Sequence, residues 1–272
     1  MIASALALLL MQVGPDPTQG SFPGIPEELR NRPQRESVAA PPATLPSSGG
    51  KLAECVTLAT EDASAASDMA QTWRETAANQ LELAQSAHCL GLALVRLDDF
   101  DGAQRAFDLA TDEVPDGAPA YRARLAAMSG NAAMAQGKPA IAEIAFARAS
   151  RFAAASADAP LTASIAVDRA RALVALDRRE EAAAELAQAR ASDPANGRAW
   201  LLSATLSRRL DRLGEAREQI AQAALLAFFL AQFALAVGRE DDARRSFESV
   251  LQVAPQSPEA TRARSYLEQL AT

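Results

Sequence analysis

The 272-residue sequence has very little of the residues on which most enzyme and metal sites depend. It contains one histidine, His88, and two cysteines, Cys55 and Cys89. A single histidine excludes paired-histidine metal sites and makes acid–base catalysis through imidazole hard to build. The sequence also has no glycine-rich loop of the phosphate-binding kind. We therefore expect a protein that is not an enzyme and that uses no metal and no cofactor.

Aromatic residues are also scarce, at 5% of the chain, and no run of alternating β-branched and aromatic residues predicts a strand. Apolar residues nevertheless make up 49%, and many of them are alanine. Alanine has the highest helix propensity and lets helices pack closely. The sequence predicts an all-α protein.

The formal charge of −7 and the pI near 5.0 argue against a nucleic-acid-binding protein, which needs a basic face. Residues Ile2 to Met11 form an apolar run too short to span a bilayer, and they resemble the apolar region of a signal peptide. We predict a signal peptide or N-terminal apolar segment at 1–13 and export to the periplasm. The alternatives are an uncleaved inner-membrane anchor and a misassigned start codon.

Residues 14–50 hold eight of the 15 prolines, with Gly, Ser, Thr and Gln between them. Such a segment buries too little apolar surface to offset its loss of conformational entropy, so it predicts a disordered linker. The helical domain is then expected to occupy residues 51–272.

One pattern recurs five times within that domain: Ala, three residues, a large apolar residue, two residues, and Ala or Val. The copies are Ala103-Phe107-Ala110, Ala142-Phe146-Ala149, Ala182-Leu186-Ala189, Ala216-Ile220-Ala223 and Ala243-Phe247-Val250. A repeated helical unit cannot bury its apolar face alone, so the copies must stack into a solenoid.

The expected helices form five hairpins between caps. The first helices of the hairpins are predicted at 84–97, 123–136, 163–176, 198–210 and 224–237, and the second helices carry the recurrent pattern. Leu52–Ala59 and Ala63–Thr76 form the N-terminal cap, and Glu259–Leu270 forms a final helix with a polar outer side. Gly and Pro residues such as Gly137, Gly238 and Pro115 stand where helices should end.

These residues resemble the tetratricopeptide repeat family. Residues 84–117 carry its pattern at Leu90, Gly91, Phe100, Ala103, Phe107, Ala110 and Pro115. The resemblance implies a right-handed α-α superhelix of about five repeats with cap helices. It also implies that the first helices line a concave groove that binds a protein or peptide partner.

The intervals between the first alanines of the pattern are 39, 40, 34 and 27 residues. The family period is 34, so the last interval lacks seven residues, close to two helical turns. Either one helix of roughly 37 Å runs from about Leu213 to Val237, or a tight turn lies near 226–228. A fused helix would prevent the fifth repeat from folding back. Phe228, Phe229 and Phe233 would then need another partner, which predicts a domain-swapped homodimer through residues 220–237.

The stretch from Ile220 to Val237 has no charged residue, Gly or Pro. Its length also suits a membrane-spanning helix, but its many alanines and its flanking repeat motifs favour the solenoid.

The cysteines and an aspartate cluster each allow two interpretations. Cys55 and Cys89 lie on alternate helices, which run side by side in such an array, so they form a disulfide or remain two buried thiols. Cys89 follows His88, but adjacent helical residues do not face each other as a catalytic pair would. Asp98, Asp99 and Asp101 look like a cation loop, but they lack the bidentate Glu and favour a solvated turn.

Charge is divided unequally between the helices. The five predicted first helices hold seven arginines and one acid, Asp168. The predicted partner-binding groove consists of Arg96, Arg124, Asn131, Arg171, Arg198, Arg208 and Arg209. Guanidinium groups suit carboxylates, so an acidic segment or a free C-terminus is the expected ligand. The alternative is that Arg96, Arg208 and Arg209 only stabilise helix ends through the helix dipole.

Some family members hold a C-terminal carboxylate with Lys, Asn and Arg of the first helices. Asn131, Arg171 and Arg198 resemble that set without its Lys. Together these features predict a non-catalytic interaction scaffold of the cell envelope. The alternatives are an assembly or maturation factor that holds a client for an enzyme, and a membrane-anchored scaffold.

Overall fold

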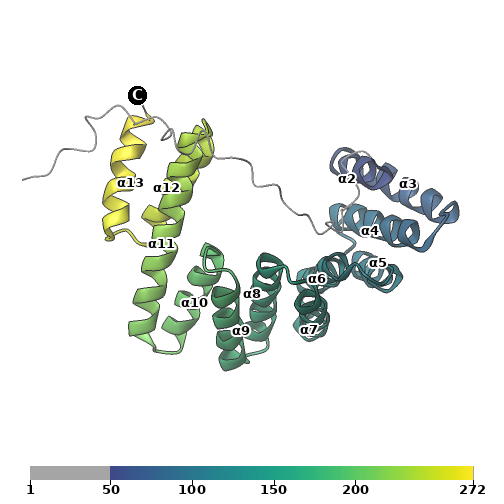
Figure 1. Cartoon of the computed structure of the whole chain (residues 1–272), viewed down its shortest axis with the longest axis horizontal. Helices are drawn as coiled ribbons and strands as arrows, with labels where there is room; N and C mark the ends of the chain where they lie inside the picture. Colours follow the sequence, from purple (N-terminus) through teal and green to yellow (C-terminus); the bar gives the residue numbers. More distant parts are fainter. Residues whose placement is uncertain (1–49, 272) are drawn as a thin grey trace, which may run out of the picture. The chain divides into compact units, whose positions relative to one another are not determined.

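The computed structural model describes residues 50–271, and within them every regular element is an α-helix (Figure 1). The segments predicted as signal peptide and linker, up to residue 49, lie outside the described residues. The helices are α2 (Lys51–Glu61), α3 (Ala63–Glu75), α4 (Gln80–Arg96), α5 (Phe100–Glu113), α6 (Pro119–Ala135), α7 (Pro139–Ser156), α8 (Ala159–Ala175), α9 (Arg179–Ser192), α10 (Gly197–Arg209), α11 (Leu213–Ala236), α12 (Glu240–Val253) and α13 (Pro258–Gln269).

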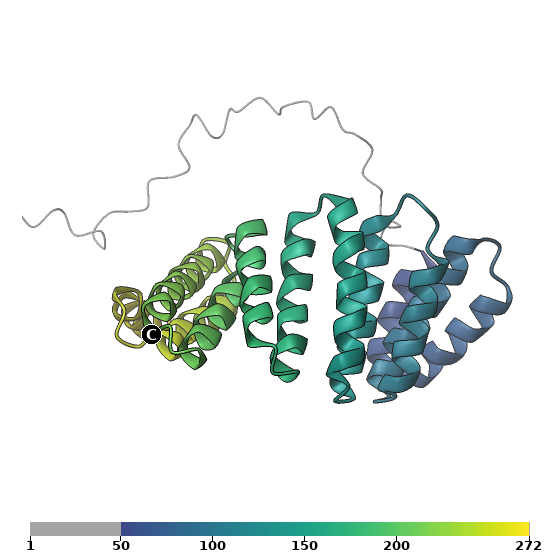
Figure 2. The ribbon, with the colours of Figure 1, turned by 90° about the horizontal axis from the view of Figure 1, so that it is seen from below.

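Each helix packs against the next one in the chain, and alternate helices such as α2 and α4, α6 and α8, or α8 and α10 also touch (Figures 1 and 2). The hairpins are α4–α5, α6–α7, α8–α9, α10 with the first half of α11, and the second half of α11 with α12. The α2–α3 pair and α13 cover the two ends. The prediction of an all-α solenoid of five hairpins with caps is confirmed.

The two helices of a hairpin pack closely because a small residue of the first helix leaves space for a large side chain of the second. A Cβ added at Gly91 would lie 2.5 Å from Phe107 Cε1, and one at Gly130 would lie 2.7 Å from Phe146 Cε1. The third and fourth hairpins carry Ala at the corresponding site, 170 and 204, and the smaller Leu and Ile at the opposing positions, 186 and 220. The recurrent pattern therefore describes one packing contact, and in the first four hairpins the side-chain volumes on the two helices compensate.

Every turn between the two helices of a hairpin contains one residue with a left-handed backbone. These residues are Asp98, Gly137, Asp177, Asp211 and Gly238, with φ between 57° and 75°. Gly and Asp tolerate this conformation better than most residues, which explains their recurrence.

The turn also accounts for the aspartate cluster. Asp99 caps α5 by accepting a hydrogen bond from the Gly102 N–H at 2.9 Å, and Asp101 pairs with Arg105 and Lys138. The part of the chain that the structure describes contains no group of three or more side chains able to hold a metal ion. The cluster is a capped, solvated turn.

The predicted start of three first helices is four residues too late. They were expected at 84, 123 and 163 but begin at Gln80, Pro119 and Ala159. The cause is local capping. Asn79 accepts from the Glu82 N–H at 3.0 Å, and Asp158 accepts from the Leu161 N–H at 3.0 Å. Pro119 and Pro160 stand in the first helical turn, where proline fits best.

The short interval produces one continuous helix, α11, whose 24 residues span about 36 Å. The fused-helix alternative is confirmed, but the expectation that the fifth repeat cannot fold back is wrong. The turn at 237–239 follows the fused helix, so α12 returns along its second half. Phe228, predicted to need an outside partner, is 2% exposed and lies 5.6 Å from Phe247 and 6.0 Å from Tyr266 between ring centroids.

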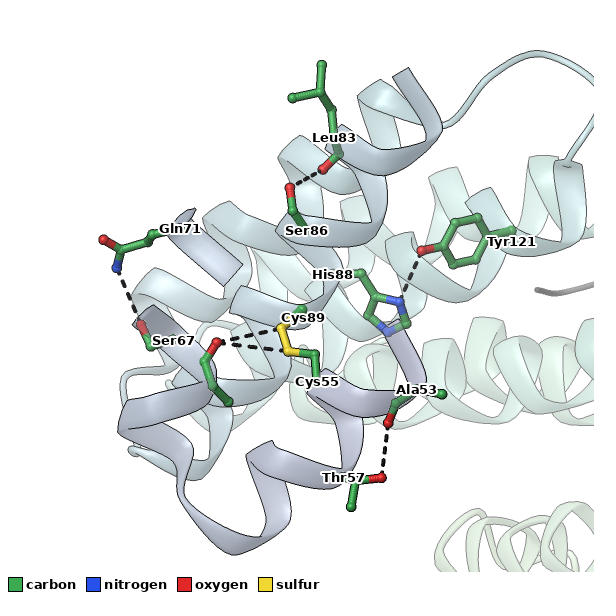
Figure 3. Close-up of a disulfide and its surroundings, with 11 residues drawn as sticks. Ala53, Cys55, Thr57, Ser67, Gln71, Leu83, Ser86, His88, Cys89 and Tyr121 are labelled. Atoms are coloured by element: carbon green, nitrogen blue, oxygen red, sulfur yellow. Dashed lines mark hydrogen bonds between the residues drawn. A yellow bond between two sulfur atoms is a disulfide. The ribbon is translucent and has the colours of Figure 1, made fainter. Parts of the chain in front are cut away.

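At the N-terminal cap, the structure joins Cys55 of α2 to Cys89 of α4, with 6.0 Å between their Cα atoms (Figure 3). Their two sulfur atoms lie 3.9 Å and 3.7 Å from the Ala66 carbonyl oxygen of α3. The neighbouring His88 points away from the sulfurs, toward Tyr121 of α6. The bond therefore joins α2 to α4 beside the Ala66 carbonyl of α3, and His88 forms no pair with a thiol.

The packing contact predicts that Gly130→Ala destabilises the protein by about 1–3 kcal/mol, because the new methyl group overlaps the Phe146 ring. Urea unfolding measures this change. Gly214→Ala is the matched control. A Cβ there meets nothing within 4 Å, so the helix should gain up to about 1 kcal/mol. Gly130→Ala with Phe146→Leu should recover part of the loss, and purely additive effects of the two substitutions would contradict the contact.

The disulfide closes a loop with a sequence separation of 34 residues. Its removal by Cys55→Ser with Cys89→Ser should cost about 3–4 kcal/mol of stability at the N-terminal end, because the unfolded loop regains its entropy. Hydrogen exchange of α2–α4 amides reports this loss, while α8–α10 serves as an internal control. Equal protection of α2–α4 in wild type and variant would contradict the prediction.

Candidate functional site

The predicted groove residues converge best between α8 and α10. A cleft of about 180 Å³ lies between these two first helices. From α8 it is lined by Arg171 and Val174, three residues apart, and from α10 by Leu202, Thr205 and Arg209. These spacings place each set on one face of its helix. The cleft is mainly apolar and has a guanidinium group contributed by each helix.

Asp168 neutralises part of the predicted positive charge. The residue is 8% exposed, and its carboxylate lies 3.3 Å from Arg171 and 3.2 Å from Arg198. A single buried carboxylate thus orients two arginines from neighbouring first helices and shares their charge. The 168–171 spacing already signals an ion pair within one helix, but the contact with Arg198 depends on how α8 and α10 pack.

Arg124, a predicted groove residue, and Arg169, which was not predicted to line the groove, have separate roles. Arg124 pairs at 3.0 Å with Asp158, the residue that caps α8. Arg169, on a first helix, turns toward the second helices and pairs with Glu143 at 2.8 Å and Glu185 at 2.6 Å. Burial raises the pKa of Glu185, although Arg169 opposes this shift. These arginines therefore join neighbouring hairpins.

Three predicted arginines, Arg96, Arg208 and Arg209, make no ion pair within residues 50–271. All three end their helices, at α4 or α10, so the helix dipole favours them there as well. Arg96 lies at the edge of a different hollow near Glu61 and Asp98. Asn131 is exposed on α6. The structure therefore brings Arg171 together with Arg209 at the cleft and with Arg198 at Asp168, and it leaves Arg96, Arg124 and Asn131 apart.

A second cleft, of about 590 Å³, lies between α10, the first half of α11 and the last turn of α12. It contains Arg208 together with Arg217 of α11. Arg217 was not among the predicted groove residues, because the family resemblance points to the first helices of the hairpins and Arg217 lies on a second helix. The signal was nevertheless present, since Leu213, Arg217 and Ile220 follow helical spacing along one face.

His88 of α4 is partly buried against Tyr121 of α6. Its Nδ1 lies 3.1 Å from the Tyr121 hydroxyl oxygen, and its Nε2 is buried. Burial lowers the pKa of His88 to about 4 and raises the pKa of Tyr121. Both side chains are therefore neutral at pH 7 and add no charge to the groove.

Comparisons with known proteins agree with this architecture. Residues 167–231 match the tetratricopeptide repeat family. A solved structure of MamA, residues 41 to the end, from Desulfovibrio magneticus RS-1 superposes with a TM-score of 0.50 and 18% identity over 65% of this chain and 96% of that one. The pilF structure of Pseudomonas aeruginosa gives 0.51 and 13% over 79% and 97%. At these identities the likeness shows the fold alone.

No curated protein sequence matches the chain. The match at 167–231 extends from α8 into α11 and thus includes the cleft between α8 and α10. Residues outside it repeat the same hairpin, with a small residue of the first helix facing a large residue of the second. The sequence match identifies residues 167–231 as a tetratricopeptide repeat segment, and the flanking hairpins share its fold.

Proposed function

We propose that the protein is a non-catalytic interaction scaffold that binds an acidic segment of a partner protein between α8 and α10. The observation that carries this proposal is the combination of an apolar cleft with Arg171 and Arg209 at its margin. Arg209 has no ion-pair partner among the described residues, and Arg171 shares one carboxylate with Arg198. A partner carboxylate would complete the pairing of these guanidinium groups.

Periplasmic export is part of the same proposal. Its support is the disulfide at the N-terminal cap, because disulfides persist in oxidising compartments. A scaffold in that compartment suits the assembly or maturation of exported clients, since its groove offers binding groups from several helices.

A second proposal concerns self-association through residues 220–237. Phe228 is satisfied within its own chain, but Phe229, Leu230, Phe233 and Val237 are 51–66% exposed along the second half of α11. An apolar face of this kind marks an interaction surface. It carries no charge, so two copies can meet without like-charge repulsion, and we propose a homodimer with α11 at its centre. Helix α11 is also long and apolar enough to cross a membrane by composition alone.

Arg171→Glu with Arg209→Glu should weaken partner binding at least about tenfold, because an attractive charge contact becomes repulsive. The partner is first identified by crosslinking and mass spectrometry in the native cell, and its affinity for the full-length protein is then measured by titration. Arg105→Glu with Arg151→Glu is the control, because both residues are exposed on second helices and the net charge changes equally. Unchanged affinity of the groove variant would contradict the proposal.

For the dimer, light scattering of the full-length protein should show a mass that rises with concentration toward twice that of one chain. Leu230→Arg with Phe233→Arg should abolish the rise by burying charge in the apolar interface. Ile144→Arg, at a site on α7 that is 68% exposed, should leave it unchanged. A wild-type protein that stays monomeric at high concentration would exclude the dimer.

A further inference from the structure

The cleft between α10, α11 and α12 exists because α11 is continuous. Its first half packs on α10 and its second half on α12, so the last turn of α12 comes to face α10. Gln252 and Val253 of that turn form one wall of the cleft, opposite Leu201 and Arg208 of α10. The 27-residue interval thus builds a cavity from α10, the first half of α11 and the last turn of α12.

The lining of this cleft combines apolar side chains with two cations. Leu201, Ile220 and Val253 supply apolar surface, and Arg208 and Arg217 supply positive charge. The residues that line it include no acid, and within residues 50–271 neither arginine makes an ion pair. Two like charges beside one apolar cavity repel each other, and an anion between them would remove that repulsion.

The cleft also adjoins the proposed groove. Thr205 of α10 lines both cavities, with Arg209 on the side of α8 and Arg208 on the side of α11. An extended segment lying across α10 would therefore reach both cavities, because successive residues of an extended chain advance by about 3.3 Å.

We propose that this cleft is an anchor pocket for the partner: it receives one large apolar side chain, while an adjacent Asp or Glu of the same internal segment binds Arg208 and Arg217. This inference rests on the proposed function, since it needs a partner segment on the first-helix face. The inference adds the chemical pattern of that segment, which is an apolar residue beside an acid. It also adds α11 and α12 to α10 as the helices that bind the segment.

The test uses the full-length protein and two libraries of random dodecapeptides, one with amidated C-termini and one with free C-termini. We expect enrichment of amidated peptides that carry a large apolar residue within two positions of an Asp or Glu. Ala216→Trp, which fills the cleft from α11, should weaken their binding at least about tenfold, as should Arg217→Gln. Ala221→Trp, at an exposed site of the same helix, is the matched control, and circular dichroism checks that each variant is folded.

The outcomes separate this inference from the proposed function. If enriched peptides are weakened by Arg171→Glu with Arg209→Glu but not by Ala216→Trp or Arg217→Gln, the anchor pocket is refuted and the groove stands. Enrichment of free C-termini alone would also refute the pocket, because the anion would then be a terminal carboxylate. No enrichment in either library would contradict both proposals.

Discussion

The structure depends on one contact, repeated in each hairpin, between a small residue of the first helix and a large side chain of the second. Where Gly91 or Gly130 occupies the first helix, a phenylalanine ring fills the space against its backbone. Where the first helix has Ala170, Leu186 occupies the opposing site. This contact keeps the helices close enough to stack. The packing of the core therefore sets the distance between neighbouring first helices on the groove face.

The contact also explains why the loss of seven residues was tolerated. Ala231 and Phe247 preserve the small-to-large arrangement in the last hairpin, although its first helix is an extension of the helix before it. The Phe247 ring stacks on Tyr266 of α13 at 4.9 Å between centroids. The final helix therefore covers the apolar side of the last hairpin and completes the cluster around Phe228.

The sequence was sufficient to predict the hairpins, because the pattern and its intervals are local features. The short interval limited residues 213–237 to a fused helix or a tight turn without deciding between them, since that choice depends on packing against α12. Helix starts were misplaced where capping by Asn79 or Asp158 decided them. The groove was harder to predict, since ion pairing joins residues from different helices. Asp168 reduces the free charge of Arg171 and Arg198, and Arg217 lies outside the helices that the family pattern nominates.

The continuity of α11 also has a mechanical consequence. In a regular array each hairpin contacts only its neighbours, so a terminal unit can open while the rest stays folded. Here one helix belongs to two hairpins, and it cannot leave α12 by bending without breaking its own backbone hydrogen bonds. The last two hairpins therefore share one continuous helix. A force applied at α13 is transmitted through α11 to α10, because no flexible turn lies between the two hairpins.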